Sequence, residues 1–148
     1  MQAAAARATH SFRGTIESIA GRAVDHGGSA DSAGVPMIFY RVKVLKALKG
    51  GKVGDAVTVA WIDTVVEGAT PLTVGATYER MTERLDGAAD PVVARFAPLY
   101  VPVGADQSVL LVKDGRVEAH GKGAGRLRAG DKTASSWDLD TVEQVLAS

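Results

Sequence analysis

Apolar and polar residues alternate along much of the chain, and this pattern predicts β-strands. In the segment 12–20, Phe12 and Ile16 fall on one face of an extended chain, while Arg13 and Glu17 fall on the other. A strand of this kind buries one face and leaves the other in contact with water. We therefore expect a half-buried strand near the start of the chain.

Two further strands follow from the same pattern. The segment 35–48 shows the strongest alternation, and a glycine-rich turn separates it from the segment 56–63, which is rich in β-branched residues. Arg41 and Lys43 are expected to point outward. The residues expected to point inward are Tyr40, Val42, Val44, Val57, Val59 and Trp61.

The segment 109–120 is predicted to form a β-hairpin. Its central dipeptide, Asp114-Gly115, suits a two-residue type I′ turn, because both positions of that turn need positive φ. Such a turn fixes the register of the two strands. The register pairs Val112 with Val117, Leu110 with Ala119, and Lys113 with Arg116.

The segment 138–147 is predicted to be a C-terminal helix. Asp138 or Asp140 supplies the N-cap, and Glu143 stands three residues after Asp140, close to the spacing of a capping box. The apolar stripe consists of Leu139, Val142, Val145 and Leu146.

Three stretches lack a clear period. Residues 25–34 are rich in turn formers and are expected to be a loop. In residues 78–108, the segment 79–85 fits either a helical turn or a strand, and three prolines favour loop and edge strand over central sheet. The alanine-rich residues 1–10 show no packing partner and are expected to be flexible. We expect one domain over residues 11–148.

Composition narrows the classes of function. The chain has 148 residues, of which 46% are hydrophobic, so one domain can bury a core without a metal or a disulfide. Seventeen basic residues balance seventeen acidic ones, so the overall charge favours neither nucleic acid nor a membrane surface. No cysteine is present, which excludes thiolate catalysis and cysteine-ligated zinc. No apolar run reaches the ~18 residues of a membrane helix.

Known catalytic and cofactor motifs are absent or incomplete. The histidines His10, His26 and His120 lack metal-ligand spacing, and His120 is expected on the exposed face of the hairpin. The sequence around Ser29 lacks the second glycine of a nucleophile elbow, and residues 121–126 lack the order of a phosphate-binding loop. The carboxylate pairs Asp138/Asp140 and Glu79/Glu83 fit helix capping and surface helix charge. We expect no catalytic residue, no metal and no cofactor.

Four short motifs follow one another along the chain. Phe12-Arg-Gly-Thr-Ile16 comes first, followed by Tyr40-Arg-Val-Lys-Val-Leu-Lys-Ala-Leu-Lys-Gly50, then Gly54-Asp-Ala-Val-Thr-Val59, and later Gly75-Ala-Thr-Tyr78. This succession, which covers most of residues 11–128, resembles the OB-fold barrel of netrin-like domains related to tissue inhibitors of metalloproteinases, especially the bacterial secreted versions. The resemblance implies a small closed or partly open β-barrel with a C-terminal helix. A generic β-sandwich or another small barrel is the alternative fold.

The resemblance does not bring an activity with it. The animal inhibitors of this group insert a disulfide-tied N-terminal cysteine into the zinc site of a protease, and this chain has no cysteine. The bacterial relatives share no activity that can be transferred, and a shared fold does not imply a shared function.

A basic stretch between residues 41 and 52 is the main candidate surface. Strands two and three form the usual ligand face of an OB barrel, where aromatic residues stack on bases. The candidate binding residues are Arg41, Lys43, Lys46 and Trp61, and the stretch also contains Lys49 and Lys52. Alternation turns Trp61 inward, however, and lysines also protect strand edges from aggregation.

We expect a non-enzymatic binding domain that contacts a protein partner and is exported or associated with the cell envelope. The alternative is an OB-fold binder of single-stranded nucleic acid or anionic glycan that uses the basic stretch. A small hydrolase built on residues 25–34 is the third and least supported hypothesis. The first ten residues contain no apolar segment of signal-peptide length, so export requires a signal peptide encoded upstream of Met1, and without one the cytoplasm is expected.

Overall fold

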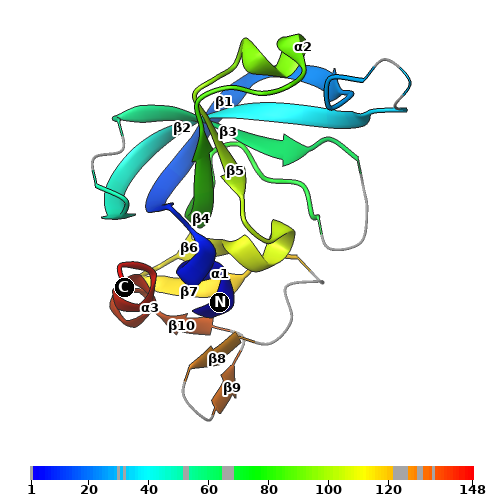
Figure 1. Ribbon diagram of the computed structural model, residues 1–148. Coiled ribbons are helices and arrows are strands. Elements are labelled where there is room, and N and C mark those ends of the chain that lie inside the picture. The colour runs from blue at the N-terminus through cyan, green and yellow to red at the C-terminus, as the bar shows by residue number, and fades with distance from the viewer. Residues whose placement is uncertain are drawn as a thin grey trace.

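Figure 1 shows a computed structural model of the chain, which is described over residues 2–29, 31, 33–51, 54–64, 69–121, 127–129, 132–134 and 136–148. The strands are β1 (His10–Asp25), β2 (Val35–Lys49), β3 (Ala56–Ile62), β4 (Thr77–Leu85), β5 (Leu99–Pro102), β6 (Val109–Lys113), β7 (Arg116–Ala119), β8 (Leu127–Ala129), β9 (Lys132–Ala134) and β10 (Ser136–Asp138). The helices are α1 (Gln2–Arg7), α2 (Pro91–Ala94) and α3 (Leu139–Leu146), with a 3-10 turn η1 (Ala105–Ser108). The expected mostly-β fold with a C-terminal helix is confirmed.

Five strands pair in a closed ring in the order β1-β2-β3-β5-β4, because β4 also pairs with β1. The pairing of β3 with β5 is parallel, and the others are antiparallel. β1 pairs with β2 along nearly its whole length and with β4 over residues 10–15. Four shifts of register along β1 and β2 mark bulges, which bend the strands so that the ring can close.

A second layer extends from β4. One edge of β4 pairs with β6 over residues 77–80 and with β5 over residues 82–85, and β7 and β10 continue the sheet from β6. In Figure 1 this layer lies below the ring, with α1 and α3 side by side and both termini close together. β8 and β9 form a separate two-stranded antiparallel sheet.

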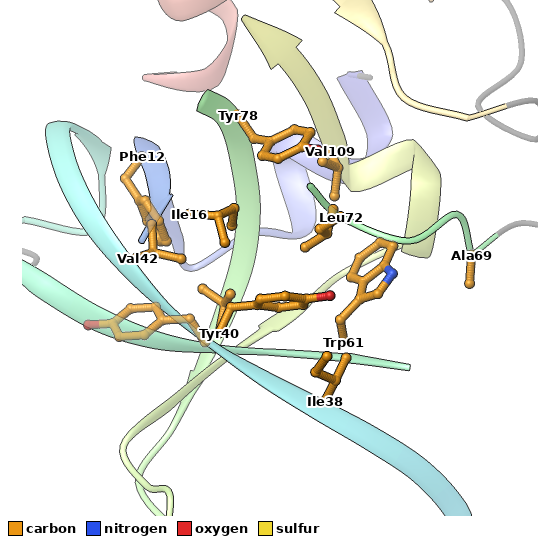
Figure 2. Close-up of a cluster of buried hydrophobic side chains, with 12 residues drawn as sticks. Phe12, Ile16, Ile38, Tyr40, Val42, Trp61, Ala69, Leu72, Tyr78 and Val109 are labelled. Atoms are coloured by element: carbon orange, nitrogen blue, oxygen red, sulfur yellow. The ribbon is translucent and has the colours of Figure 1, made fainter. Parts of the chain in front are cut away.

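Side chains inside the ring form the main core (Figure 2). This core contains the predicted inward residues of the first three strands, including Phe12, Ile16, Tyr40, Val42, Val59 and Trp61. A second apolar cluster lies between the second layer and the two terminal helices, and a third packs Phe39 against α2 and its neighbours. Alternation along β1, β2 and β3 therefore predicted the inward faces correctly, but it did not predict that Phe39 and Ala60 are buried on the outer face.

The hairpin and the terminal helix are confirmed in detail. Val112 pairs with Val117, Leu110 with Ala119, and Lys113 with Arg116, as the turn chemistry predicted. The turn residues Asp114 and Gly115 have φ of 53° and 74°. Asp138 caps α3 by accepting a hydrogen bond from the Thr141 N–H at 3.1 Å.

Two expectations about less regular segments were wrong. The segment 99–102 lies between β3 and β4 rather than at an edge; Pro98 precedes this short strand and Pro102 ends it, so neither proline occupies its interior. The N-terminal residues do have a packing partner, because Ala4, Ala5 and Ala8 are buried in the same cluster as α3. The ambiguous segment 79–85 belongs to the strand β4.

Candidate functional site

The predicted basic residues lie on the outer face of the ring. Arg41, Lys43 and Lys46 are all exposed residues of β2 that point away from the ring interior, and Arg13 of β1 stands directly opposite Lys46. We call Arg13, Arg41, Lys43 and Lys46 the basic face. Lys49 turns toward α1, where its ammonium donates to the Ala5 carbonyl at 2.9 Å, and Lys52 lies outside the described residues.

Strand register arranges the basic face in rows. In one row, Lys46 of β2, Arg13 of β1 and Glu79 of β4 are direct cross-strand neighbours. In the next row, Lys43 pairs with Thr15, whose hydroxyl lies 2.7 Å from that of Thr77. The sheet thus brings together residues that are far apart in the chain.

The cations of the basic face are offset only in part. Glu143 of α3 lies over the first row, with Oε1 at 3.3 Å from the Lys46 ammonium and Oε2 at 3.5 Å from the Arg13 guanidinium. Arg41 and Glu17 are 3.9 Å apart and both exposed, so their attraction is weak. Lys43 has no acidic partner within the described part of the chain.

Glu79 of this row and Glu143 of α3 form a buried carboxyl pair. Glu79 is 0% exposed and Glu143 is 4% exposed. Burial, together with its interaction with Glu143, raises the pKa of Glu79 to about 9. Burial alone would raise the pKa of Glu143 as well, but Glu79, Arg13 and Lys46 outweigh it and lower that pKa. At neutral pH the pair therefore holds one proton on Glu79 and one negative charge on Glu143.

A surface hollow of about 360 Å³ lies between β2 and α3, next to the row that contains Lys46. Its lining includes Lys46, Asp140, Glu143 and Gln144. The capping-box role expected for Glu143 was wrong, because its side chain turns toward the ring. The surface-helix role expected for Glu79 was also wrong, because this residue is buried in a strand.

Trp61 is buried, so it cannot stack on a base. It is 1% exposed and donates its indole N–H to the Thr70 carbonyl at 3.1 Å. The same carbonyl lies 2.8 Å from His120 Nε2. Trp61 therefore belongs to the packed interior and is separated from the three basic residues with which it was grouped.

His120 is buried, and the expectation that it lies on the surface was wrong. Its ring packs edge-on against Tyr78. Nearby, the buried Asp106 carboxylate accepts hydrogen bonds from the Thr70 N–H and hydroxyl, both at 2.7 Å. This network ties the chain that follows β3 to the second layer, so we assign it a structural role.

A second hollow, of about 540 Å³, lies beside the loop after β1. Its lining includes His26, Ser29 and Asp90. The Asp90 carboxylate accepts hydrogen bonds from the backbone N–H groups of His26 and Val92, and these bonds lower the pKa of Asp90. Asp90 thus caps α2 and anchors the loop after β1.

Comparison with known proteins identifies no family for this chain. Its sequence matches no protein-family model and no curated protein. The resemblance to netrin-like domains therefore stays a prediction. Within the described residues, no helix has the length and apolarity needed to cross a membrane, and no three His, Asp or Glu side chains are grouped so that they could hold a metal ion.

Proposed function

We propose that this chain is a non-enzymatic binding domain that contacts an acidic segment of a protein partner through the basic face. The observation that supports this most is Lys43, which is exposed between Arg41 and Lys46 and has no acidic partner in the described part of the chain. An uncompensated cation on a sheet face attracts a negatively charged partner and speeds its association.

The partner class follows from the composition of the face. Thr15 and Thr58 lie beside the cations as cross-strand neighbours of Lys43 and Arg41, and Trp61 and Tyr40 are buried. Single-stranded nucleic acid needs exposed aromatic rings on which bases stack. The basic face offers charge and hydroxyl groups instead, which suit acidic side chains and the backbone of a peptide.

We also propose that the ring is an OB-like barrel of the netrin-like kind. The order β1-β2-β3-β5-β4, closed by β4 on β1, and the long bulged β1 support this proposal. In an OB fold the face of strands two and three binds the ligand. The basic face lies on that side of β2, so the fold proposal and the binding proposal point to the same surface. Export or envelope association, the localisation that goes with this resemblance, is tested by whether the gene encodes a signal peptide upstream of Met1.

A charge reversal tests the binding proposal. Binding of a fluorescent poly-glutamate peptide and of a labelled oligothymidylate is measured at low ionic strength for the unaltered protein, Lys43→Glu and Lys113→Glu. Lys113 is an exposed residue of the hairpin, so it gives the same change of charge at a distant place. We expect Lys43→Glu to weaken poly-glutamate binding about tenfold, which equals about 1.4 kcal/mol, and Lys113→Glu to have little effect.

The other outcomes count against the proposal. If the unaltered protein does not bind poly-glutamate, the basic face is not an acidic-peptide site. If it binds oligothymidylate instead, with an affinity that falls steeply with salt and is lost in Lys43→Glu, the nucleic-acid alternative is correct.

A further inference from the structure

Arg80 is a buried cation inside the ring. It lies two residues after Tyr78 on β4, is 1% exposed, and places its guanidinium carbon 5.2 Å from the centre of the Trp61 ring. Figure 2 shows Tyr78 and Trp61 as members of the main core. The three guanidinium nitrogens of Arg80 have no hydrogen-bond partner within the described structure.

A buried guanidinium without a partner is costly. Removing a cation from water costs several kcal/mol unless an anion and hydrogen bonds compensate for it. Burial lowers the pKa of Arg80 to about 10, so the group keeps its charge at neutral pH. Buried donors in proteins are almost always bonded, and this side chain has five of them.

No acidic side chain within the described residues forms an ion pair with Arg80. Glu79 is its neighbour in sequence but points to the opposite face of the sheet, toward Glu143. Asp106 accepts from Thr70, and Asp63 is paired with Arg22 at 3.0 Å.

Tyr78 lies close enough to Arg80 to interact with it electrostatically, and its hydroxyl group can donate to an anion. The Tyr78 hydroxyl oxygen accepts a hydrogen bond from the Thr73 N–H at 2.9 Å, which leaves its own proton free to donate. Tyr40 is also close enough to interact electrostatically with Arg80. Apolar side chains of the ring core surround these groups and strengthen any electrostatic contact made there.

We propose that Arg80 binds a small oxyanion inside the ring, either phosphate or the carboxylate of a small acid. The guanidinium donates two N–H groups to the anion in the forked geometry that suits both chemistries, and Tyr78 adds its O–H. The site is distinct from the basic face, because it lies on the inner side of the strands.

The test compares Arg80→Met with Arg84→Met. Arg84 lies on the same strand but is exposed and paired with Asp86, so it controls for the loss of an arginine. Each protein is unfolded in urea and refolded in sodium phosphate, sodium acetate or sodium chloride at constant ionic strength and neutral pH, because a buried site exchanges slowly. Thermal unfolding is then followed as a function of anion concentration.

We expect the Tm of the unaltered protein and of Arg84→Met to rise with the concentration of phosphate or acetate relative to chloride, because a ligand that binds only the folded state stabilises it. The anion that gives the larger rise identifies the class. Arg80→Met should show no such rise. An equal Tm in all three salts, or an equal rise in Arg80→Met, would overturn the proposal.

Two further variants keep the test decisive. If Arg80→Met does not fold, Arg80→Lys keeps the charge but loses the forked donors, and should bind the preferred anion about tenfold more weakly.

Glu67, which lies outside the described residues, is changed to Gln to ask whether the chain itself supplies the anion. We expect Glu67→Gln to keep the response of the unaltered protein, and a response that appears only in this variant would contradict the proposal.

Discussion

Glu79 and Arg80 are adjacent on β4 and both buried, yet their side chains point to opposite faces of the sheet and do not pair. Successive residues of a strand always diverge in this way. The cost of burying each side chain must therefore be offset separately. Glu79 keeps a proton beside Glu143, and we propose that Arg80 binds an anion.

The Glu79 pair makes stability depend on pH. An unfolded glutamate loses its proton near pH 4.5, whereas folded Glu79 keeps its proton up to about pH 9. The folded state therefore binds more protons between these values, so stability should fall as the pH rises through this range, by up to about 1.4 kcal/mol per pH unit. The lowered pKa of Glu143 acts in the opposite sense: its contribution is present above its ordinary pKa and is lost as the pH falls.

Urea unfolding across this pH range measures the effect. Glu79→Gln, which cannot ionise, should flatten the decline in stability, while Glu118→Gln, at an exposed position of β7, should leave it unchanged. A stability curve that is flat from acid to alkaline pH in the unaltered protein would show that Glu79 does not keep its proton.

Asp106→Asn should destabilise the fold by about 2–3 kcal/mol, because hydrogen bonds to a buried carboxylate are worth more than neutral ones. The amide would also turn a donor toward the Thr70 N–H or hydroxyl, both of which now donate to Asp106. Thermal or urea unfolding measures the loss. Asp140→Asn, at an exposed position in the first turn of α3, is the control and should cost less than ~0.5 kcal/mol.

Gly121→Ala and Gly51→Ala separate backbone strain from crowding. Both glycines have positive φ, of 70° and 79°, and alanine in that conformation costs about 1–2 kcal/mol. A Cβ at Gly51 would meet no described atom within 4 Å, whereas one at Gly121 would collide with Thr70 and Asp106. Gly121→Ala should therefore lower the free energy of unfolding by ~1–3 kcal/mol more than Gly51→Ala does. Equal losses in the two variants would argue against the close contact.

Two neighbouring alanines test whether α1 packs on the second layer. Ala5 is 4% exposed, whereas Ala6 is exposed. Ala5→Glu would bury a carboxylate against the cluster that contains Leu146, and should lower the free energy of unfolding by ~3 kcal/mol or more. Ala6→Glu should change it by less than ~0.5 kcal/mol. Similar Tm values for the two variants would mean that α1 does not cover this cluster.

The sequence predicted the regular part of the fold well for a physical reason. The first three strands of the ring and the β6–β7 hairpin each turn one face toward an apolar core, so apolar residues recur at every second position and mark that face, although Phe39 and Ala60 are buried on the opposite face as well. The Asp114-Gly115 turn then fixed the hairpin register, because few other dipeptides accept positive φ twice.

Long-range contacts explain what the sequence did not predict. β5 is four residues long, and its neighbours in the ring come from distant segments, so no local period reveals it. β4 interrupts its own alternation by burying Glu79 on one face and Arg80 on the other.

The candidate site was predicted only in part. Arg41, Lys43 and Lys46 belong to the basic stretch that the sequence singled out, whereas Arg13 joins the basic face from β1 through strand pairing. Glu143 was missed, because its role depends on how α3 docks over β1 and β2. Trp61 was grouped with the basic residues on the analogy of base stacking, although its position in the alternation already turned it inward.

The most direct test of the proposed function is to map the binding surface by the amide chemical shifts of isotope-labelled protein during titration with poly-glutamate. We expect shifts concentrated on the strand segments 13–18, 41–46 and 56–58, and we expect these shifts to disappear in Lys43→Glu and at high salt. Shifts located on the hairpin or around the loop after β1, or no shifts at any peptide concentration, would contradict the assignment of the basic face as the binding site.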